Sequence, residues 1–315
     1  MNILLLNEAE VRSLLDPDAL LGALAEGFSA QTDGLVDAPQ RTSVTVPGAG
    51  FLLTMPAYQQ GREVTVKMVS VFAENARLGV PTHQALICLF DPSTGSPLAF
   101  MDGNAITALR TAGAAALSTR LLARPHVATL AIVGAGAEGE AHLALLPRVR
   151  PFTEIRIASR HRAHAERLVA QDVRARVVET AEEAVRGADV VCLCTDASTP
   201  VINRDWLASG THVTSVGYAP PGSELDPRLL SDSYLAVETR LAFEPAPVGC
   251  VELAGLDASM GAELGEILLG QRRGRQSDDE ITVYKAMGHA SEDMAAASLI
   301  YRRAQREGAG RTIAL

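Results

Sequence analysis

Apolar runs alternate with amphipathic segments through the second half of the chain. The expected strands lie at 128–133, 154–158, 176–178, 189–195, 212–216 and 234–237, with helices such as 161–171 and 180–186 between them. Strands that are apolar along their whole length are typical of a parallel sheet that helices cover on both faces. The pattern therefore predicts an α/β fold with a Rossmann-type, doubly wound parallel sheet.

The first third of the chain has a different pattern, in which apolar and polar residues alternate with a period of two. This predicts antiparallel strands at 41–46, 51–56, 65–72, 83–90 and 97–101, after opening helical turns at 7–34 and before a long helix at 106–122. The last segment reads as an amphipathic helix that packs back on this region. We therefore expect a smaller α+β domain at 1–118 together with 289–315, and a dinucleotide-binding domain at 119–288.

A glycine motif follows the first apolar strand of the second half. The stretch Val133–Gly139 reads VGAGAEG, with strand formers before it and helix formers after it. In this context Gly134 allows a tight turn, Gly136 lacks the Cβ that would block a pyrophosphate, and Gly139 lets the helix approach the strand. The motif, which includes Glu138, predicts a dinucleotide site at a helix N-terminus. A purely structural turn is the alternative.

The end of the next strand indicates which dinucleotide binds. An NAD site usually has a carboxylate there for the adenosine ribose, but this chain has Ser159, Arg160, His161 and Arg162. A hydroxyl and two guanidinium groups suit a 2′-phosphate, so we expect NADP(H) in preference to NAD(H). Alternatively, the arginines only begin the following helix on a solvated face.

Three cations lie in places where a solvated charge is not expected. Only two of the 28 basic residues are lysine, and one of them, Lys67, alternates with Thr65 and Val69 on an apolar strand face. Arg110 is surrounded by small residues in the long helix, and Arg41 begins a strand. A buried ammonium is costly unless it is paired or binds an anion, so Lys67 is either a ligand-binding residue or an edge lysine that reaches water.

Composition and charge exclude several classes of protein. The formal net charge of −9 argues against nucleic acid or an anionic membrane as a partner. The apolar run at 3–6 is too short for a secretion signal, and no segment is long enough to span a membrane. Cys192 and Cys194 lie in an apolar run, which indicates core residues rather than metal ligands. We expect a reduced, soluble, cytoplasmic protein without a metal site.

With these segments in place, the sequence resembles the ornithine cyclodeaminase/mu-crystallin family along nearly its whole length. The motifs that carry the resemblance are LLTMPAY (52–58), VKMVSVFAEN (66–75), the stretch 79–118 with PTHQ and ITALRTA, VGAGAEG (133–139), VGYAPPGSELD (216–226) and ITVYKAMGHASEDMAAA (281–297). LLTMPAY, PTHQ and ITALRTA are more specific to the family than the glycine motif.

The resemblance implies roles for individual residues. Arg41, Lys67 and Arg110 match the basic residues that hold the substrate's α-carboxylate, with Thr82 in the same pocket, and Asp226 matches a proposed proton-transfer carboxylate. Thr195 and Gly217 match positions near the cofactor's ribose and nicotinamide, as do Lys285 and Gly288 within the stretch 285–289. The family also implies a homodimer joined through the N-terminal strands. From the residues alone, Asp226 before a proline could simply cap the next helix, which is the commoner role for such a residue.

The implied activity is an NAD(P)(H)-linked reaction at the α C–N bond of a small amino or imino acid, either cyclodeamination or reduction of a cyclic ketimine. Cyclodeamination of ornithine needs a carboxylate for the distal ammonium, and the stretch 51–60 has none, although Glu63 or Glu74 are near in sequence. PTHQ and the basic Ser159–Arg162 segment are closer to the ketimine-reductase side of the family. An alanine dehydrogenase-like enzyme and a non-catalytic NADP-dependent binder are the alternatives.

Overall fold

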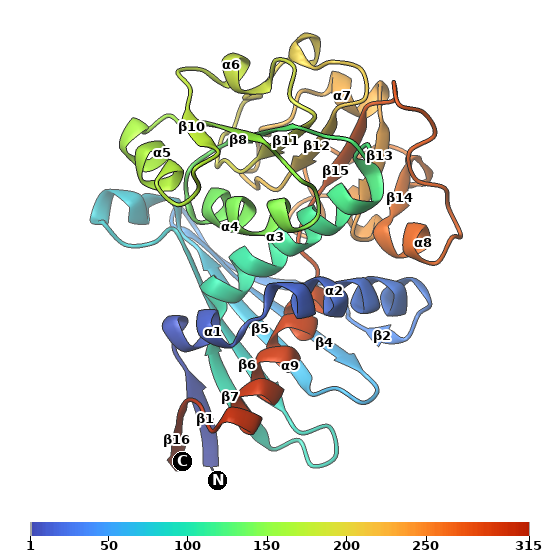
Figure 1. Cartoon of the computed structure of the whole chain (residues 1–315). Coiled ribbons are helices and arrows are strands. Elements are labelled where there is room, and N and C mark those ends of the chain that lie inside the picture. The colour runs from blue at the N-terminus through green and yellow to red at the C-terminus, as the bar shows by residue number, and fades with distance from the viewer. Residues whose placement is uncertain (1, 315) are drawn as a thin grey trace. The chain divides into compact units, whose positions relative to one another are not determined.

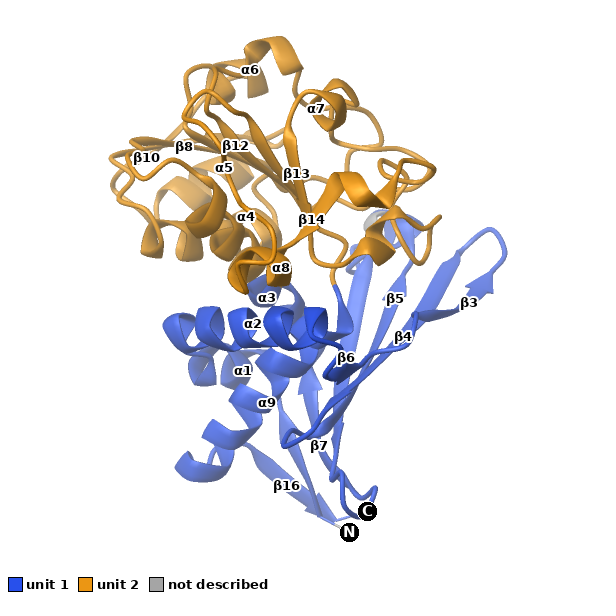
Figure 2. Ribbon diagram, turned by 90° about the vertical axis from the view of Figure 1, so that its right-hand side faces the viewer, with its two compact units in different colours: residues 1–110, 289–315 blue, residues 111–288 orange. Residues whose placement is uncertain are grey.

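A computed structural model describes residues 2–314 of the chain, apart from the side chain of Ala76. The chain divides into two compact units. Unit 1 contains residues 1–110 and 289–315, and unit 2 contains residues 111–288 (Figure 2). The expected boundary after residue 118 falls inside a helix that begins in unit 1, and the roles of the two domains stay predictions.

Unit 2 is built on a parallel sheet of eight strands (Figure 1). The strands are β8 (Thr129–Val133), β9 (Glu154–Ala158), β10 (Ala175–Val177), β11 (Val190–Leu193), β12 (His212–Ser215), β13 (Tyr234–Val237), β14 (Gly261–Glu263) and β15 (Thr282–Lys285). Their order is β10-β9-β8-β11-β12-β15-β13-β14, and every neighbouring pair is parallel. The strand order reverses between β8 and β11, which is where ligands bind in doubly wound sheets. The predicted fold class is confirmed.

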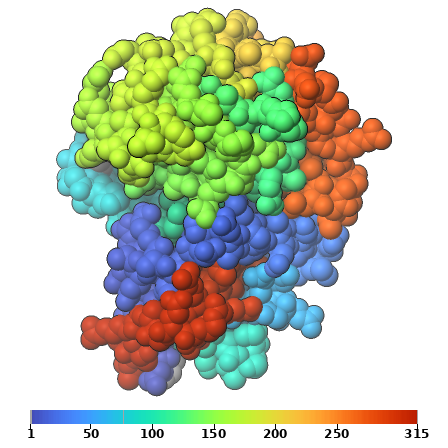
Figure 3. Space-filling view, in the orientation of Figure 1, coloured from blue at the N-terminus to red at the C-terminus, as the bar shows by residue number. Residues whose placement is uncertain are grey.

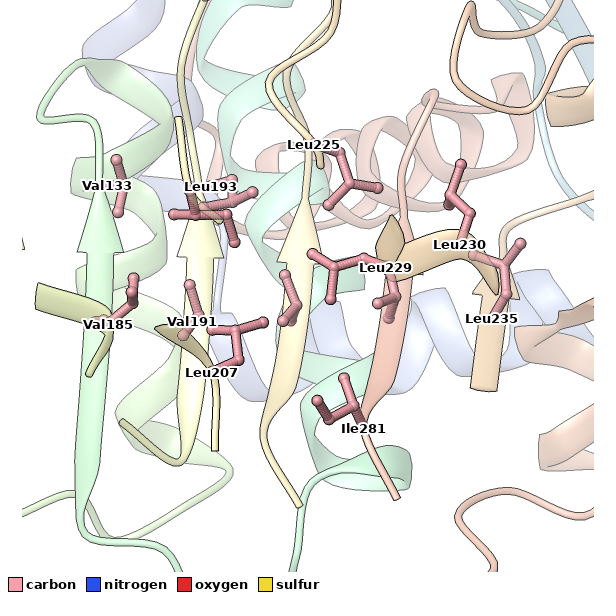
Figure 4. Close-up of a cluster of buried hydrophobic side chains, with 14 of the residues drawn as sticks. Val133, Val185, Val191, Leu193, Leu207, Leu225, Leu229, Leu230, Leu235 and Ile281 are labelled. Carbon is pink, nitrogen blue, oxygen red and sulfur yellow. The ribbon is translucent and has the colours of Figure 1, made fainter. Parts of the chain in front are cut away.

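Short helices connect these strands: α4 (Ala137–Leu145), α5 (Arg162–Val169), α6 (Ala181–Val185), α7 (Arg228–Ser231) and α8 (Leu264–Leu268), with 3-10 turns at Leu146–Arg148, Arg204–Trp206, Arg240–Phe243 and Ala258–Met260. Aliphatic side chains of β8, β11 and β13 meet those of α6 and α7 in one buried cluster (Figure 4). Val133, Leu193 and Leu229 are part of it and are at most 5% exposed. The helices therefore anchor the sheet through apolar packing, and the ends of the strands carry the polar residues.

Unit 1 contains a second sheet, made of β16-β1-β7-β6-β5-β4-β2, with β3 paired to β4. Its strands are β1 (Asn2–Leu6), β2 (Val36–Asp37), β3 (Thr42–Val46), β4 (Gly50–Gln59), β5 (Val64–Val71), β6 (His83–Phe90), β7 (Pro97–Asp102) and β16 (Arg311–Ala314). The helices are α1 (Glu8–Leu14), α2 (Pro17–Thr32), the 3-10 helix η1 (Ala73–Leu78) and α9 (Ala290–Glu307), and α3 (Gly103–Leu122) begins here. The pairs from β3 to β7 are antiparallel, as the period-two pattern predicts.

Helices α2 and α9 lie next to each other in unit 1, as Figure 3 shows in blue and red. Helix α9 packs on β4, β5 and β6, so one face of these strands is buried. On β4 this face carries Leu53 and Met55, each 4% exposed, while Leu52 on the other face is 40% exposed. The alternation of the sequence thus separates a covered face from an exposed one.

Five strands lie outside the expected elements, namely β1, β2, β14, β15 and β16. The apolar run Asn2–Leu6 forms β1, which pairs with β7 in parallel and with the C-terminal β16 in antiparallel. Strand β15 inserts between β12 and β13, although it follows β14 in the sequence. Both cases depend on pairing between segments far apart in the chain, which no local pattern reports. No helix in residues 2–314 is long and apolar enough to cross a membrane.

Candidate functional site

The glycine motif forms the turn between β8 and α4 in unit 2. Gly134 has a φ of +108°, and a Cβ there would overlap the carbonyl of Cys194 on the neighbouring strand. A Cβ on Gly139 would overlap the carbonyl of Gly134, so the helix approaches the strand closely. Gly136, by contrast, has no atom within 4 Å of its Cβ position. The first and third glycines are therefore required by the fold, while the second leaves open space.

That open space suits an anion. Gly136 is the N-cap of α4 and offers no side chain to cap it, so the N–H groups of the first helical turn are available to a ligand together with the positive end of the helix dipole. A pyrophosphate fits such a glycine turn. Glu138 lies in the same turn and is half-buried, and its backbone carbonyl contacts Nδ1 of His142 at 2.7 Å. The binding roles of these residues stay predictions.

Glu224 joins three segments at the strand ends of unit 2. Its carboxylate is 1% exposed and accepts four hydrogen bonds, from the backbone N–H and hydroxyl of Thr195, the hydroxyl of Ser215 and the backbone N–H of Gly217. The four donors satisfy a buried charge that would otherwise be costly. Glu224 therefore holds Thr195 and Gly217, two of the predicted cofactor-binding residues, in a fixed arrangement.

Lys285 supports the same strand ends. Its Nζ donates to the carbonyl of Gly217 at 2.7 Å and pairs with Glu252 at 3.1 Å, and its side chain is fully buried. Three residues on, the backbone N–H of Gly288 donates to Glu238 at 2.8 Å, as does the neighbouring N–H of Met287. The contacts of Lys285 and Gly288 are thus structural supports of the strand ends at which the sequence places the nicotinamide.

Asp226 sits in a local ion cluster. Its carboxylate accepts from the backbone N–H groups of Arg204 and Arg228, at 2.8 Å and 3.0 Å, and from the Arg228 guanidinium at 3.0 Å. Burial opposes the ionisation of Asp226, but these hydrogen bonds outweigh it and lower its pKa. The arrangement suits the helix-start role that the residues alone also allowed. The proton-transfer role of Asp226 stays a prediction.

The basic segment after β9 has two differently engaged arginines. Arg162 pairs with Glu166 at 2.8 Å and with Glu179, and these carboxylates raise its pKa. Arg160 makes one pair, with Asp196 at 3.5 Å, in which both side chains are strongly exposed. The hydroxyl of Ser159 accepts from the backbone N–H of His161. Because exposed pairs are weak, a phosphate would displace one such pair at Arg160 and two at Arg162.

In unit 1 the structure brings Lys67 and Arg110 together at the start of α9. One oxygen of Asp293 accepts from Lys67 Nζ at 3.2 Å and from Arg110 Nε at 3.1 Å. The neighbouring Glu292 accepts from Arg110 at 3.2 Å. The four side chains are at most 6% exposed. Lys67 is therefore not an edge lysine that reaches water, and it belongs to a buried cluster of two cations and two anions, which we call the α9 ion cluster.

Opposing effects act on the pKa of Lys67 within this cluster. Burial lowers its pKa most, the negative charge of Asp293 raises it, and the nearby Arg110 lowers it again. The result is a pKa of about 8, against an ordinary value of 10.5. An ammonium with this pKa is mostly charged at neutral pH and still able to exchange its proton.

Arg41 and two histidines adjoin the cluster. Burial lowers the pKa of His289, the N-cap of α9, to about 4, and the charges of Arg41 and Arg110 lower it further. Burial also lowers the pKa of His83 to about 4, with Lys67 as the next cause. All three predicted cations thus act on the same end of α9, and the two histidines are neutral at physiological pH.

Thr82 is placed differently. It is exposed just before β6, and its backbone carbonyl accepts from the N–H of Phe72. The charge of Lys67 lowers the pKa of the next residue, His83. The pocket role of Thr82 stays a prediction.

Sequence reasoning missed Glu292 and Asp293. Both lie in the motif HASEDMAAA, whose apolar continuation indicates a helix that is buried along much of its length. Two acids at the start of a buried helix need cationic partners. The sequence thus indicates that Glu292 and Asp293 have cationic partners, but it does not say which residues these partners are.

Comparison with known proteins gives a consistent result. A sequence model of the ornithine cyclodeaminase/mu-crystallin family matches residues 1–308. Ketimine reductase mu-crystallin of Mus musculus is 40% identical over 295 residues, which cover 92% of this chain and 91% of that protein. The structure of Thermococcus litoralis Δ(1)-pyrroline-2-carboxylate reductase in complex with NADH and L-proline has a TM-score of 0.92 at 31% identity, covering 99% of this chain and 100% of that one.

An archaeal alanine dehydrogenase dimer with bound NAD has a TM-score of 0.91 at 30% identity, with both chains fully covered. The matches to these relatives cover 92% or more of this chain. The chain belongs to the ornithine cyclodeaminase/mu-crystallin family.

Proposed function

We propose that this protein reduces a small cyclic imino acid to the corresponding amino acid, with NADPH as the preferred cofactor. The reaction class follows from the family: the chain is a nicotinamide-dependent oxidoreductase of the ornithine cyclodeaminase and ketimine reductase type. The observation that supports the substrate class is the α9 ion cluster, in which a lysine with a pKa of about 8 lies beside an arginine.

The cations of unit 1 suit an α-imino acid for two reasons. A carboxylate is held best by charged donors that are already fixed in place, and Lys67 and Arg110 are both fixed by Asp293. Arg41, on the same side of α9, adds a third positive charge. In an α-imino acid the carboxylate and the C=N bond are adjacent. A side chain that binds the carboxylate therefore also lies within reach of the C=N bond.

A reduced nicotinamide, when bound, would supply the hydride for the imine carbon. We assign the accompanying proton to Lys67: its ammonium donates a proton to the imine nitrogen, which receives the electron pair of the C=N bond. After the product has left, a proton from the solvent restores the buried ammonium. A donor with a pKa near the working pH is effective in this role. Asp226 is the weaker candidate, because its pKa is lowered and Arg228 already holds its carboxylate.

The acidic residues favour imine reduction over ornithine cyclodeamination. Glu63 pairs with Arg302 of α9 at 3.3 Å, and Glu74 pairs with Arg77 at 2.7 Å. The two carboxylates that the sequence offered for a distal ammonium thus already have cationic partners. A substrate without a distal charge avoids the cost of leaving that ammonium unpaired.

The preference for NADPH rests on the segment after β9. That segment carries Ser159 and Arg160, and Arg160 is held only by an exposed pair. We also propose that unit 1 binds the substrate and a second copy of the chain, that unit 2 binds the cofactor, and that the enzyme works in the cytoplasm. Buried free cysteines at positions 88, 192, 194 and 250 accord with a reducing compartment.

The direct test is to incubate the purified protein with pyrroline-2-carboxylate or its six-membered homologue and follow the nicotinamide absorbance with NADPH and NADH in parallel. We expect imine-dependent oxidation of the cofactor, with a higher kcat/KM for NADPH. Lys67→Met should lower kcat/KM by about a hundredfold or more, the usual effect of removing a general acid.

Three results would contradict the proposal. Ammonia release from ornithine without net cofactor consumption would identify a cyclodeaminase. NADH formation from alanine, with no activity on imines, would identify an alanine dehydrogenase. Quenching of NADPH fluorescence without turnover of any of these substrates would identify a binding protein.

A further inference from the structure

The start of α9 concentrates negative charge inside unit 1. Glu292 and Asp293 are the third and fourth residues of the helix, and they are 1% and 0% exposed. The positive end of the helix dipole favours carboxylates there, and Glu292 also accepts from the backbone N–H of His289 in a capping box. Asp293 has no such capping duty. Among the described residues, it accepts side-chain hydrogen bonds from Lys67 and Arg110.

Asp293 holds both cations through a single oxygen. Lys67 Nζ comes from β5 and Arg110 Nε from α3, and both donate to Oδ1. An ammonium rotates freely about its last bond, and a guanidinium is rigid, so a shared acceptor gives each a defined direction. The other oxygen of Asp293 is buried and accepts no hydrogen bond from the described residues. The carboxylate is thus committed to the two cations.

We propose that Asp293 is a positioning residue of the imino-acid site, which directs Lys67 and Arg110 toward the substrate carboxylate and keeps Lys67 charged at neutral pH. This inference rests on the proposed function for the substrate, but the effect on Lys67 is a property of the protein alone. Asp293 touches neither substrate nor cofactor in this proposal and acts through the two cations.

Lys67 has a pKa closer to neutral pH than His83 or Asp293, which lie next to it. Asp293 and Glu292 face it from α9 and Arg110 from α3, and His83 adjoins it on β6. The pKa of Asp293 is lowered by the two cations despite its burial. His83 has a pKa of about 4, so it stays neutral through the range in which Lys67 loses its proton.

The chain offers a direct measurement, because it has two lysines, Lys67 and Lys285. Protein labelled with ¹³C at the lysine Cε gives two NMR signals, which Lys67→Arg assigns. We expect the Lys67 signal to titrate near pH 8 in the wild type and at least about one pH unit lower in Asp293→Asn, since a nearby negative charge favours the ammonium. The Lys285 signal serves as the internal reference, because the Asp293→Asn substitution should not alter it. An unchanged Lys67 midpoint would overturn the proposal.

Kinetics provide the second measurement. In Asp293→Asn the alkaline limb of kcat/KM should move to lower pH together with the NMR midpoint, and KM for the imino acid should rise roughly ten- to a hundredfold, more than kcat falls. Glu307→Gln is a matched control on the same helix, because Glu307 is exposed and pairs with the half-buried Arg303. Equal losses in both variants, or a fall in kcat without a change in KM, would contradict a positioning role.

Two outcomes need separate readings. If the wild type turns over no imino acid, the proposed function fails, while the lysine titration still decides whether Asp293 controls Lys67. If Asp293→Asn does not fold, the double variant Asp293→Asn/Lys67→Met decides. Recovery of folded protein is expected, because it removes the uncompensated buried ammonium. Failure of the double variant to recover would mean that Asp293 does not act through Lys67.

Discussion

Arg160 and Arg162 lie two positions apart and have the same side chain, yet their surroundings differ. Arg162 pairs with two carboxylates and Arg160 with one, and all of these side chains are largely exposed. A phosphate thus displaces one weak surface pair at Arg160 and two at Arg162, and it offers a charge-assisted hydrogen bond in return. We therefore propose that Arg160 contributes more than Arg162 to binding the 2′-phosphate, and the sequence-based expectation for both arginines stays a prediction.

This difference predicts unequal effects of two alanine substitutions. Arg160→Ala should raise KM for NADPH about ten- to a hundredfold, the usual loss for a hydrogen bond to a charged group, and leave KM for NADH nearly unchanged. Arg162→Ala is the matched control and should alter neither value by more than about twofold. Steady-state kinetics with both cofactors measure the effect. Equal losses for NADPH in the two variants would refute the assignment.

Strands β3, β4 and β6 carry exposed apolar residues on the sheet face that lies opposite helix α9. Helix α9 covers one face of β4, β5 and β6. The opposite face keeps apolar residues in contact with solvent: Val44 is 66% exposed, and Leu52 and Leu86 are each 40% exposed. Val44 and Leu52 lie directly opposite each other on β3 and β4. Large apolar side chains exposed on one face of a sheet, with two of them directly opposite each other, are typical of an interaction site.

We expect this face to join two copies of the chain. Replacing Val44 and Leu52 by glutamate places two charges in the centre of the interface, so the double variant should sediment as a monomer where the wild type sediments as a dimer. Val173→Glu is the control, because Val173 is fully exposed in unit 2. A dimer that survives the double substitution would place the interface elsewhere.

Buried histidines make the stability of the whole protein depend on pH. His142 and His212 are fully buried in unit 2, and burial lowers their pKa values to about 4 and about 3. His289 in unit 1 has a pKa of about 4. Each folded pKa lies below the ordinary value of 6.5, so below that pH the unfolded chain takes up protons that the folded chain does not. Stability therefore falls as the pH drops below 6.5 and continues to fall toward pH 4.

Denaturant unfolding should report this loss. Each histidine contributes about 1.4 kcal/mol per pKa unit, so the free energy of unfolding should be lower by several kcal/mol at about pH 5 than at about pH 7.5, a range above the usual titration of carboxylates. His212→Gln should show a shallower dependence than the wild type, because it removes one of the titrating groups. A free energy that is constant between the two pH values would contradict the assignment.

Local sequence determined the architecture of each unit and part of the site. The parallel sheet follows from continuous apolar strands. The glycine turn follows from positions 134 and 139, where only glycine fits because a Cβ would overlap the backbone. Period-two alternation placed Lys67 on the covered face of β5. These features act over a few residues, so they are visible without a structure.

Only the tertiary structure decided which charges meet. Asp293 lies 226 residues after Lys67, and the contact exists because α9 packs back on the sheet. The same holds for β1, whose apolar run becomes a strand through pairing with β7 and β16. An ion pair or a strand pair depends on how remote segments pack, and the period of a short segment carries no information about its distant partner.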